Sequence, residues 1–318
     1  MRYLTCIVAI FAISTSTCLF SQEAKKKPKQ ESARVEEQIT VRQDVEYAKA
    51  GEHSLQLNVY TPKAFSAQPR PCIVWIHGGG WQKGDKSSGG ARVAKWVASG
   101  EYVGVSVGYR LTDKAVWPAQ IYDCKAAIRY IRANAPALGI NPDRIGVWGG
   151  SAGGHLVSLL GTSGDVPELE GSLGVTGVSS RVTCVVDYCG PSNFLRLDPE
   201  TPKLNTPGQS VYNLFGGPIK EKTEVAKQAS PATYVSKDDP PFLIVHGTAD
   251  PLVPLDQATS FHQAQLDAGM KSTFIKMEGG GHGIGGNEIE SRVKIFFDRE
   301  LLGRKVELSD ATIDVTPK

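Results

Sequence analysis

The chain has 318 residues, of which 41% are apolar, so it can bury a core large enough for one α/β domain or two smaller ones. Its 35 basic and 33 acidic residues leave a formal net charge of +2, which gives no sign of the basic surface that nucleic-acid binding requires. Phosphate-rich partners are therefore not expected.

The first 21 residues have the pattern of a secretory signal peptide. Arg2 precedes an apolar run from Leu4 to Ile13, and small residues follow from Ser14 to Ser21. The apolar run is too short to span a bilayer. We expect a secreted or periplasmic protein with no membrane insertion after cleavage. Lipoprotein processing before Cys18 is the alternative, although the residues before it match a lipobox poorly.

Residues 22–38 contain the basic run Lys25 to Lys29 and few apolar side chains, which predicts a flexible linker. We expect the folded domain to cover 39–303 and a C-terminal tail to cover 304–318. Alternation of polar and apolar residues predicts half-buried strands over Asp44 to Tyr47 and Leu55 to Tyr60.

From Cys72 to Ile76 the apolar run is continuous, as is typical of a strand covered on both faces. Strands and helices then alternate. Helices are predicted over Val93 to Ser99, Ala119 to Asn134, Leu255 to Ala268 and Ile289 to Leu302, and strands over Tyr102 to Val107, Ile145 to Gly149, Val182 to Tyr188, Phe242 to Val245 and Thr273 to Met277. This order predicts a mostly parallel central sheet with helices on both faces and the first strands antiparallel to it.

Two long segments rich in Gly, Pro and Ser interrupt this alternation, Asp165 to Ser180 and Phe194 to Lys237. Loops of this length in a compact domain often form lids or binding walls. We expect both to form the rim of a pocket beyond the carboxyl ends of the strands, with plain surface loops as the alternative.

Four cysteines remain once a signal peptide is removed: Cys72, Cys124, Cys184 and Cys189. The last two lie in one predicted strand, too far apart to form a disulfide with each other. We expect buried free thiols, and no spacing of Cys and His suggests a metal site.

The segment Gly149 to Gly154 lies between a predicted strand and a predicted helix, with Ser151 at its centre. A chain that turns this sharply needs glycine on both sides, because a Cβ would collide with neighbouring backbone. Gly149 and Gly153 meet that need. The pattern is typical of a turn that exposes a nucleophilic serine, and Ser151 is the candidate nucleophile.

A nucleophilic serine needs a base and an acid that orients the base. His282 lies in the glycine-rich loop between the last predicted strand and the last helix, and we assign it as the base. Of the other histidines, His53 lies in a predicted hairpin, and His155 and His262 lie in predicted helices. His246 belongs to the segment His246 to Asp250, and His77 belongs to the segment His77 to Trp81, where we expect it to hold the loop.

Asp250 follows the strand before that of His282, and neighbouring parallel strands deliver their trailing loops to one edge, so Asp250 is the expected acid. Asp256 is an alternative, but it opens a helix, where a carboxylate commonly caps the N-terminus. Asp187 is a weaker alternative. The order Ser151, Asp250, His282 is the one expected for this fold.

Three glycines after the central strand, in His77-Gly78-Gly79-Gly80, leave backbone N–H groups free to point into a site. We expect Gly79, Gly80 and Ala152 to donate to an oxyanion. Trp81 is expected either to line the substrate pocket or to anchor this loop.

These segments together resemble the α/β-hydrolase family, in particular the HGGG-type esterases related to hormone-sensitive lipase, and most closely the bacterial feruloyl-esterase-like BD-FAE group. The resemblance covers about residues 40 to 303. It rests on five motifs: His77-Gly78-Gly79-Gly80-Trp81, Tyr109-Arg110-Leu111, Asp143 to His155, His246-Gly247-Thr248-Ala249-Asp250 and Gly281-His282-Gly283. Phe194 to Lys237 matches no family pattern.

The resemblance implies a serine carboxylesterase that needs no cofactor and acts on acetyl or feruloyl esters of polysaccharides or small carbohydrates. Two alternatives remain open. One is a serine peptidase of the oligopeptidase type, although the chain has no room for the propeller domain of those enzymes. The other is a non-catalytic binding module on a hydrolase scaffold.

Overall fold

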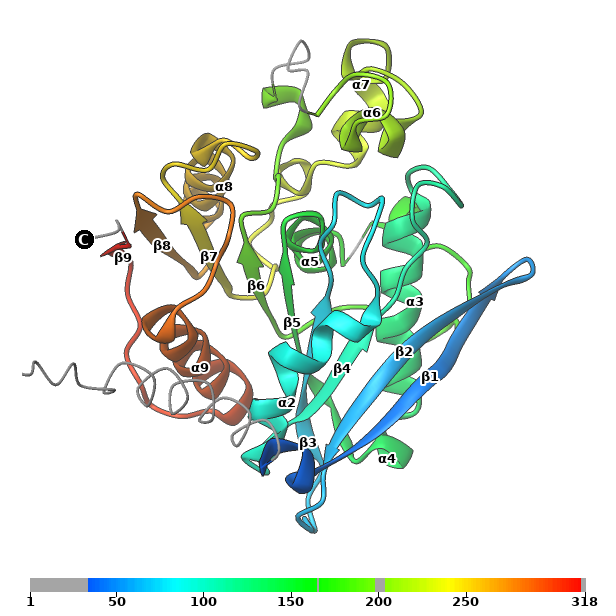
Figure 1. Ribbon diagram of the computed structural model, residues 1–318, viewed down its shortest axis with the longest axis vertical. Helices are drawn as coiled ribbons and strands as arrows, with labels where there is room; N and C mark the ends of the chain where they lie inside the picture. Colours follow the sequence, from blue (N-terminus) through cyan, green and yellow to red (C-terminus); the bar gives the residue numbers. More distant parts are fainter. Residues whose placement is uncertain (1–33, 165, 198–203, 316–318) are drawn as a thin grey trace, which may run out of the picture.

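A central sheet runs through the computed structural model, which describes residues 34–164, 166–197 and 204–315 (Figure 1). In chain order its strands are β1 (Ile39–Ala50), β2 (His53–Pro62), β3 (Arg70–Ile76), β4 (Val103–Val107), β5 (Ile140–Gly150), β6 (Cys184–Tyr188), β7 (Phe242–Gly247), β8 (Ser272–Glu278) and β9 (Ala311–Asp314). Their order across the sheet is β1-β2-β4-β3-β5-β6-β7-β8-β9. β1 and β2 form an antiparallel hairpin and β2 is antiparallel to β4, whereas every later pairing is parallel. The predicted sheet is confirmed.

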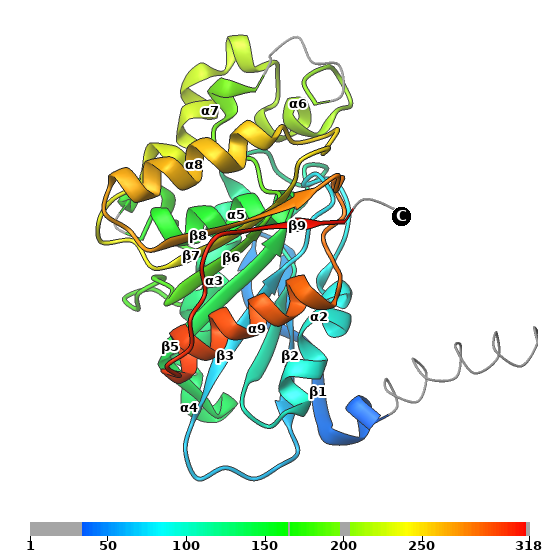
Figure 2. The ribbon, with the colours of Figure 1, turned by 90° about the vertical axis from the view of Figure 1, so that its left-hand side faces the viewer.

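The helices are α2 (Gly90–Ala98), α3 (Ala119–Ala133), α4 (Ala135–Leu138), α5 (Ala152–Thr162), α6 (Ser210–Phe215), α7 (Thr223–Gln228), α8 (Leu255–Asp267) and α9 (Asn287–Leu302). α2 and α9 cover one face of the sheet (Figure 2). On this face Trp96 and Phe297 pack edge-on against Trp148. α3, α5 and α8 cover the other face, where they bury residues such as Leu156 and Phe261. Because both faces are covered, the central strands are apolar along their whole length.

The long predicted helices and strands are all present, and their ends differ most where polar residues interrupt a strand. β5 begins at Ile140 rather than at Ile145, because Asn141, Pro142 and Asp143 break the apolar run that the sequence pattern follows. β7 continues to Gly247, beyond the apolar run that ends at Val245, so that His246 lies within the strand.

The C-terminal tail expected from residue 304 is not separate from the sheet, which corrects that boundary. Residues 311–314 form β9, which pairs in parallel with β8 from Ile275 to Glu278. Four residues with alternating exposure are too short for periodicity to distinguish from a loop, so the neighbouring strand decides their conformation.

The predicted signal peptide, 1–21, lies outside the described residues. Of the predicted linker the structure describes residues 34–38, and these are helical. None of the helices within the described part of the chain combines the length and apolarity that a bilayer crossing needs. The four cysteines at 72, 124, 184 and 189 are buried free thiols, as predicted, although Cys189 lies just after β6 rather than within it.

The expectation that both long segments form the pocket rim is wrong for the first of them. Residues 166–180 follow α5, so they lie at the amino ends of the strands, opposite the loops that follow the strands. The buried guanidinium of Arg129 on α3 holds this segment by donating to the carbonyls of Glu170, Leu173 and Val175 at 2.6 to 2.8 Å. The prediction failed because it did not separate a loop that follows a helix from one that follows a strand.

The second segment behaves as expected and builds a cap over the carboxyl ends of the strands. Its described part contains α6 and α7, which stand above the sheet in Figures 1 and 2. Leu197, Leu204, Gln209, Ser210 and Val211 from this segment line the cavity that also contains Ser151 and His282.

Candidate active site

Ser151 lies in the turn between β5 and α5. Its backbone angles, φ 56° and ψ −120°, are ones that residues other than glycine rarely adopt. Two backbone hydrogen bonds of Ser151 fix the turn. The Ser151 N–H donates to the carbonyl of Tyr188 at 2.7 Å, and the Ser151 carbonyl accepts from His155 at 3.0 Å. The turn therefore presents the Ser151 side chain at the sheet edge, as the sequence predicts.

The two glycines predicted to permit this turn are both required. A Cβ on Gly149 would lie 2.3 Å from the Gly153 carbonyl oxygen, and a Cβ on Gly153 would lie 2.1 Å from that of Ile76. Both obstacles are backbone atoms of the sheet and the helix, which cannot move aside independently.

We expect Gly153→Ala to destabilise the fold by about 3 kcal/mol or more, because the contact with Ile76 overpacks the core. Alanine is intrinsically better than glycine in a helix by about 1 kcal/mol, so the steric cost decides the sign. Gly285→Ala is the matched control, since nothing lies within 4 Å of its added Cβ. Urea unfolding of both variants measures the difference; equal stabilities would show that the backbone at the turn leaves room for a side chain.

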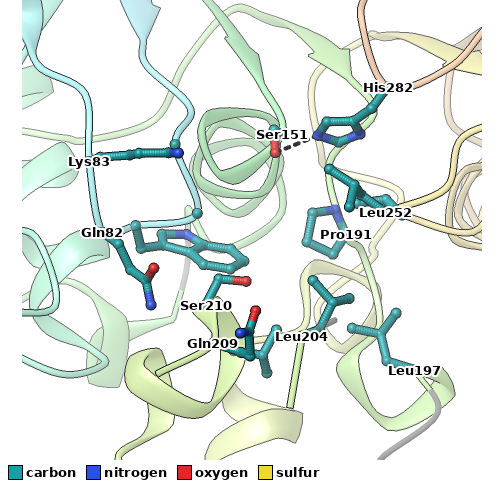
Figure 3. Close-up of a pocket in the computed structure, with 15 residues that line it drawn as sticks. Gln82, Lys83, Ser151, Pro191, Leu197, Leu204, Gln209, Ser210, Leu252 and His282 are labelled. Carbon is teal, nitrogen blue, oxygen red and sulfur yellow. Dashed lines mark hydrogen bonds between the residues drawn. The ribbon is translucent and has the colours of Figure 1, made fainter. Parts of the chain in front are cut away.

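The structure brings Ser151, His282 and Asp250 into one hydrogen-bonded line. His282 Nε2 lies 2.8 Å from Ser151 Oγ (Figure 3), and on the other side of the ring His282 Nδ1 lies 2.7 Å from Asp250 Oδ2. Since Asp250 can only accept when ionised, Nδ1 carries the proton and Nε2 accepts from the Ser151 hydroxyl. These are the contacts expected of a nucleophile, a base and an acid that orients the base.

Asp250 is held in its charged form. Its side chain is shielded from solvent, and burial alone would raise its pKa. Hydrogen bonds from His246, from His282 and from the N–H groups of Leu252 and Val253 outweigh burial and bring the pKa of Asp250 well below its ordinary value. The carboxylate is therefore charged near neutral pH and available to the imidazole.

The alternative acids are engaged elsewhere. Asp256 forms a bidentate ion pair with Arg196 at 2.8 and 3.0 Å, and both side chains are half exposed. Asp187 accepts from Ser158 Oγ and from the Gly190 N–H, each at 2.9 Å, and burial raises the pKa of Asp187. Geometry therefore favours Asp250 as the partner of His282.

The loop after β3 also reaches Ser151. Gly79 and Gly80 have φ values of 106° and 62°, and both line the cavity with Ser151. Within the described residues, no group accepts a hydrogen bond from either N–H. Ala152 follows Ser151 as the first residue of α5. Gly79 and Gly80 thus line the same cavity as Ser151, and Ala152 directly follows Ser151 in the chain; that their N–H groups bind an oxyanion stays a prediction.

His77, which precedes these glycines, holds the loop as its sequence position predicts. Its Nδ1 donates to the Gly78 carbonyl at 2.8 Å, and its ring stacks on Tyr109 with 4.3 Å between centroids. The Tyr109 hydroxyl donates in turn to the His77 carbonyl at 3.0 Å. These contacts hold the glycine loop at its first residue.

Trp81 both lines the cavity beside Ser151 and anchors the loop, so the two expected placements are compatible; its contact with a substrate stays a prediction. It is 3% exposed, and its Nε1 donates to His155 Nδ1 at 3.2 Å. His155 Nε2 donates to the Ala229 carbonyl at 2.7 Å. His155 therefore connects the glycine loop and α5 to the cap segment, a link between distant parts of the chain that no local pattern predicts.

Acid should weaken this connection. Burial lowers the pKa of His155 to about 4 from 6.5, against a smaller opposing effect of the Ala229 hydrogen bond. The unfolded chain therefore binds the proton first as pH falls, so the stability present above pH 6.5 is lost progressively down to about pH 4. At pH 5 the expected loss from this group is about 2 kcal/mol.

Urea unfolding at pH 7.5 and pH 5.0 tests this expectation against His155→Gln, whose neutral amide can still donate to Ala229 and accept from Trp81. The wild type should lose about 2 kcal/mol more than the variant over this interval. An equal loss in both proteins would assign the acid sensitivity to other groups.

Two residues at the site were not assigned a role from the sequence. His246 Nε2 donates to the Val253 carbonyl at 2.9 Å and lies 3.3 Å from Asp250 Oδ2, so it holds the loop that carries Asp250. Cys189 Sγ lies 3.4 Å from the His282 carbonyl oxygen. Burial raises the pKa of the Cys189 thiol, so it remains protonated and can donate. The sequence offered one indication of the role of His246, its position four residues before Asp250.

Cys189, Asp250 and His282 also offer metal-type ligand atoms within 4.8 Å of one another, the one such group within the residues that the structure describes. The 2.7 Å between Asp250 Oδ2 and His282 Nδ1 is a hydrogen bond. Ligands of one tetrahedral zinc ion stand about 3.3 Å apart, given bond lengths of about 2.0 Å. The distance between Asp250 and His282 therefore fits a hydrogen-bonded pair rather than two ligands of one metal ion.

The mostly parallel sheet, with Ser151, Asp250 and His282 converging on loops at its carboxyl edge, defines the chain as an α/β-hydrolase. It belongs to the BD-FAE family, whose sequence profile matches residues 57–265. The resemblance seen in the sequence is thereby confirmed.

Similar proteins are named as esterases. The chain is 33% identical over 231 residues to the esterase LipC of Mycobacterium tuberculosis, an alignment that covers 72% of this chain and 56% of LipC. It is 32% identical over 191 residues to the probable carboxylic ester hydrolase LipM of the same organism, covering 60% of this chain and 44% of LipM. The chain thus spans about half the length of the curated relatives it matches.

Solved structures cover more of the chain. A truncated form of a carbohydrate esterase from gut microbiota superposes with a TM-score of 0.75 and 32% identity, covering 83% of this chain and 96% of that one. Native esterase 2 of Thermogutta terrifontis superposes with a TM-score of 0.67 and 27% identity, covering 84% and 95%.

Proposed function

We propose that this protein is a serine carboxylesterase that cleaves carboxylic esters through an acyl-enzyme. The observation that carries the proposal is the unbroken line of hydrogen bonds from Asp250 through His282 to Ser151. The names of the relatives point to the same class of reaction.

In the first step, Ser151 Oγ attacks the ester carbonyl carbon while His282 Nε2 takes the hydroxyl proton. The charge that develops on the carbonyl oxygen is stabilised by the N–H groups of Gly79, Gly80 and Ala152, which need no reorganisation when the charge appears. The ionised Asp250 stabilises the imidazolium. His282 then gives its proton to the alcohol oxygen as the carbon–oxygen bond breaks.

In the second step, water attacks the acyl group on Ser151, and His282 takes a proton from that water. Collapse of the second tetrahedral intermediate returns the proton to Ser151 Oγ and releases the acid. The same three side chains serve both steps, so the chain's own residues supply all the proton transfers.

We propose acetyl or feruloyl esters of polysaccharides or small carbohydrates as substrates. The support is the likeness to a structure named as a carbohydrate esterase and the polar residues Gln82, Gln209 and Ser210 in a cavity of about 430 Å³. Hydroxyl-rich substrates require such hydrogen-bonding groups.

Two measurements test the proposal. A fluorophosphonate probe should label the folded protein at Ser151 and should fail to label Ser151→Ala; a folded wild type that resists labelling would instead indicate a non-catalytic binding module. A panel of acetylated xylan, methyl ferulate and short 4-nitrophenyl esters identifies the substrate, and an aminoacyl amide paired with the matching ester separates an esterase from a peptidase.

A further inference from the structure

The cavity beside Ser151 has two chemically different walls. Gln82, Lys83, Gln209 and Ser210 form a polar wall, whereas side chains such as Leu204 and Leu252 form an apolar one. Figure 3 shows Lys83 and Gln82 on the side of Ser151 away from His282, and Leu252 on the same side as His282. A bound ester therefore meets different chemistry at its two ends.

Lys83 gives the polar wall a positive charge. Among the described residues that line the cavity, it is the only ionisable side chain besides His282, and none of them is acidic. The neighbouring charges in the same loop are engaged elsewhere: Lys86 pairs with Asp44 at 2.9 Å, and Asp85 accepts from the Ser87 N–H at 2.6 Å. As far as the described residues go, the cavity thus presents to its ligand a cation with no acidic side chain on the same lining.

The position of Lys83 follows from the glycine loop. Its N–H donates to the Gly79 carbonyl at 3.1 Å, and a Cβ on Gly79 would lie 3.1 Å from Lys83 Cγ. The stem of the side chain therefore runs along the loop that carries the oxyanion donors, and the side chain extends toward the cavity (Figure 3). Its ammonium group is a compact charge with three donors on a flexible stem.

We infer that Lys83 is a specificity-determining residue that favours esters carrying a carboxylate in addition to the ester group. This inference rests on the proposed esterase function. The carboxylate can belong to the alcohol half, as in an acylated uronic acid, or to the acyl half, as in a half-ester of a dicarboxylic acid. Both sources offer the same charge to Lys83, and the experiment separates them.

The expected size of the effect is modest, because Lys83 is exposed to solvent. Ion pairs at exposed sites change an equilibrium by up to about fivefold. The effect should also fall as salt is added, since the screening length is only about 10 Å at 0.1 M. A preference for anionic substrates that falls with salt is therefore due to the charge of Lys83 and not to the shape of its side chain.

The experiment compares kcat/KM for two matched pairs of substrates. The acyl pair is 4-nitrophenyl hexanoate and the 4-nitrophenyl half-ester of adipic acid. The alcohol pair is an acetylated methyl glucoside and the corresponding acetylated methyl glucuronoside. The proteins are the wild type, Lys83→Gln, Lys83→Glu and the control Lys86→Gln, which removes a nearby charge outside the cavity.

For at least one pair, the ratio of anionic to neutral kcat/KM should fall about fivefold in Lys83→Gln and further in Lys83→Glu. It should be unchanged in Lys86→Gln, and in the wild type it should fall as salt is raised. The pair that responds tells which half of the ester lies along the polar wall.

A ratio that stays constant for both pairs in both Lys83 variants would overturn the inference, even if all rates change together. In that case the wild type still hydrolyses the neutral esters, so the esterase function stands. A wild type that hydrolyses none of the four substrates, and is not labelled by the fluorophosphonate, would instead refute the proposed function.

Discussion

Ser151→Ala should lower kcat for 4-nitrophenyl acetate by about six orders of magnitude, because the three residues of such a site act as a unit. The variant keeps the Cβ and the turn, and loses only the hydroxyl that lies 2.8 Å from His282 Nε2. The change therefore removes the proposed nucleophile without adding a steric conflict.

Stopped assays at high protein concentration are needed to measure so large a loss, and fluorophosphonate labelling of the same sample detects any wild-type contaminant. The thermal midpoint should stay close to that of the wild type, because one partly buried hydrogen bond contributes about 1 kcal/mol. A folded variant that keeps more than about a thousandth of the activity would show that another group attacks the ester.

Asp250→Asn should lower kcat by about four orders of magnitude, the loss typical when the orienting carboxylate of such a triad is replaced by an amide. The asparagine oxygen can still accept from the N–H groups of Leu252 and Val253, so the loop geometry is retained. The amide NH₂ group would then face His282 Nδ1. A donor at this place favours the tautomer protonated on Nε2, which cannot accept the Ser151 proton.

Asp256→Asn is the matched control, because it replaces the alternative acid of the same segment and breaks only the half-exposed pair with Arg196. Its kcat should stay within about twofold of the wild type, as expected for a surface ion pair. A large loss in Asp256→Asn, together with a small loss in Asp250→Asn, would reverse the assignment of the acid.

The site could be assembled from the sequence because each of its parts lies in a strongly marked local pattern. Ser151 is flanked by the glycines that its turn requires, and Asp250 and His282 each follow an apolar strand. The parallel order of β7 and β8 brings the ends of those strands to one edge, so their loops must lie close together.

Contacts between distant segments were not visible in the same way. The hydrogen bond from Cys189 to the His282 carbonyl and the connection of Trp81 to Ala229 through His155 join residues far apart in the chain. Hydrophobic periodicity reports only which face of an element is buried, and it does not report which element covers that face.

By itself, the sequence determined the alternation of strands and helices, the turn at Ser151 and the identity of the three residues that meet there, since periodicity and glycine requirements are properties of short stretches. Only the tertiary structure decided that β9 joins the sheet, that residues 166–180 lie away from the site, and that Lys83 faces a cavity with an apolar opposite wall. These features depend on packing between segments whose separation along the chain leaves no local pattern.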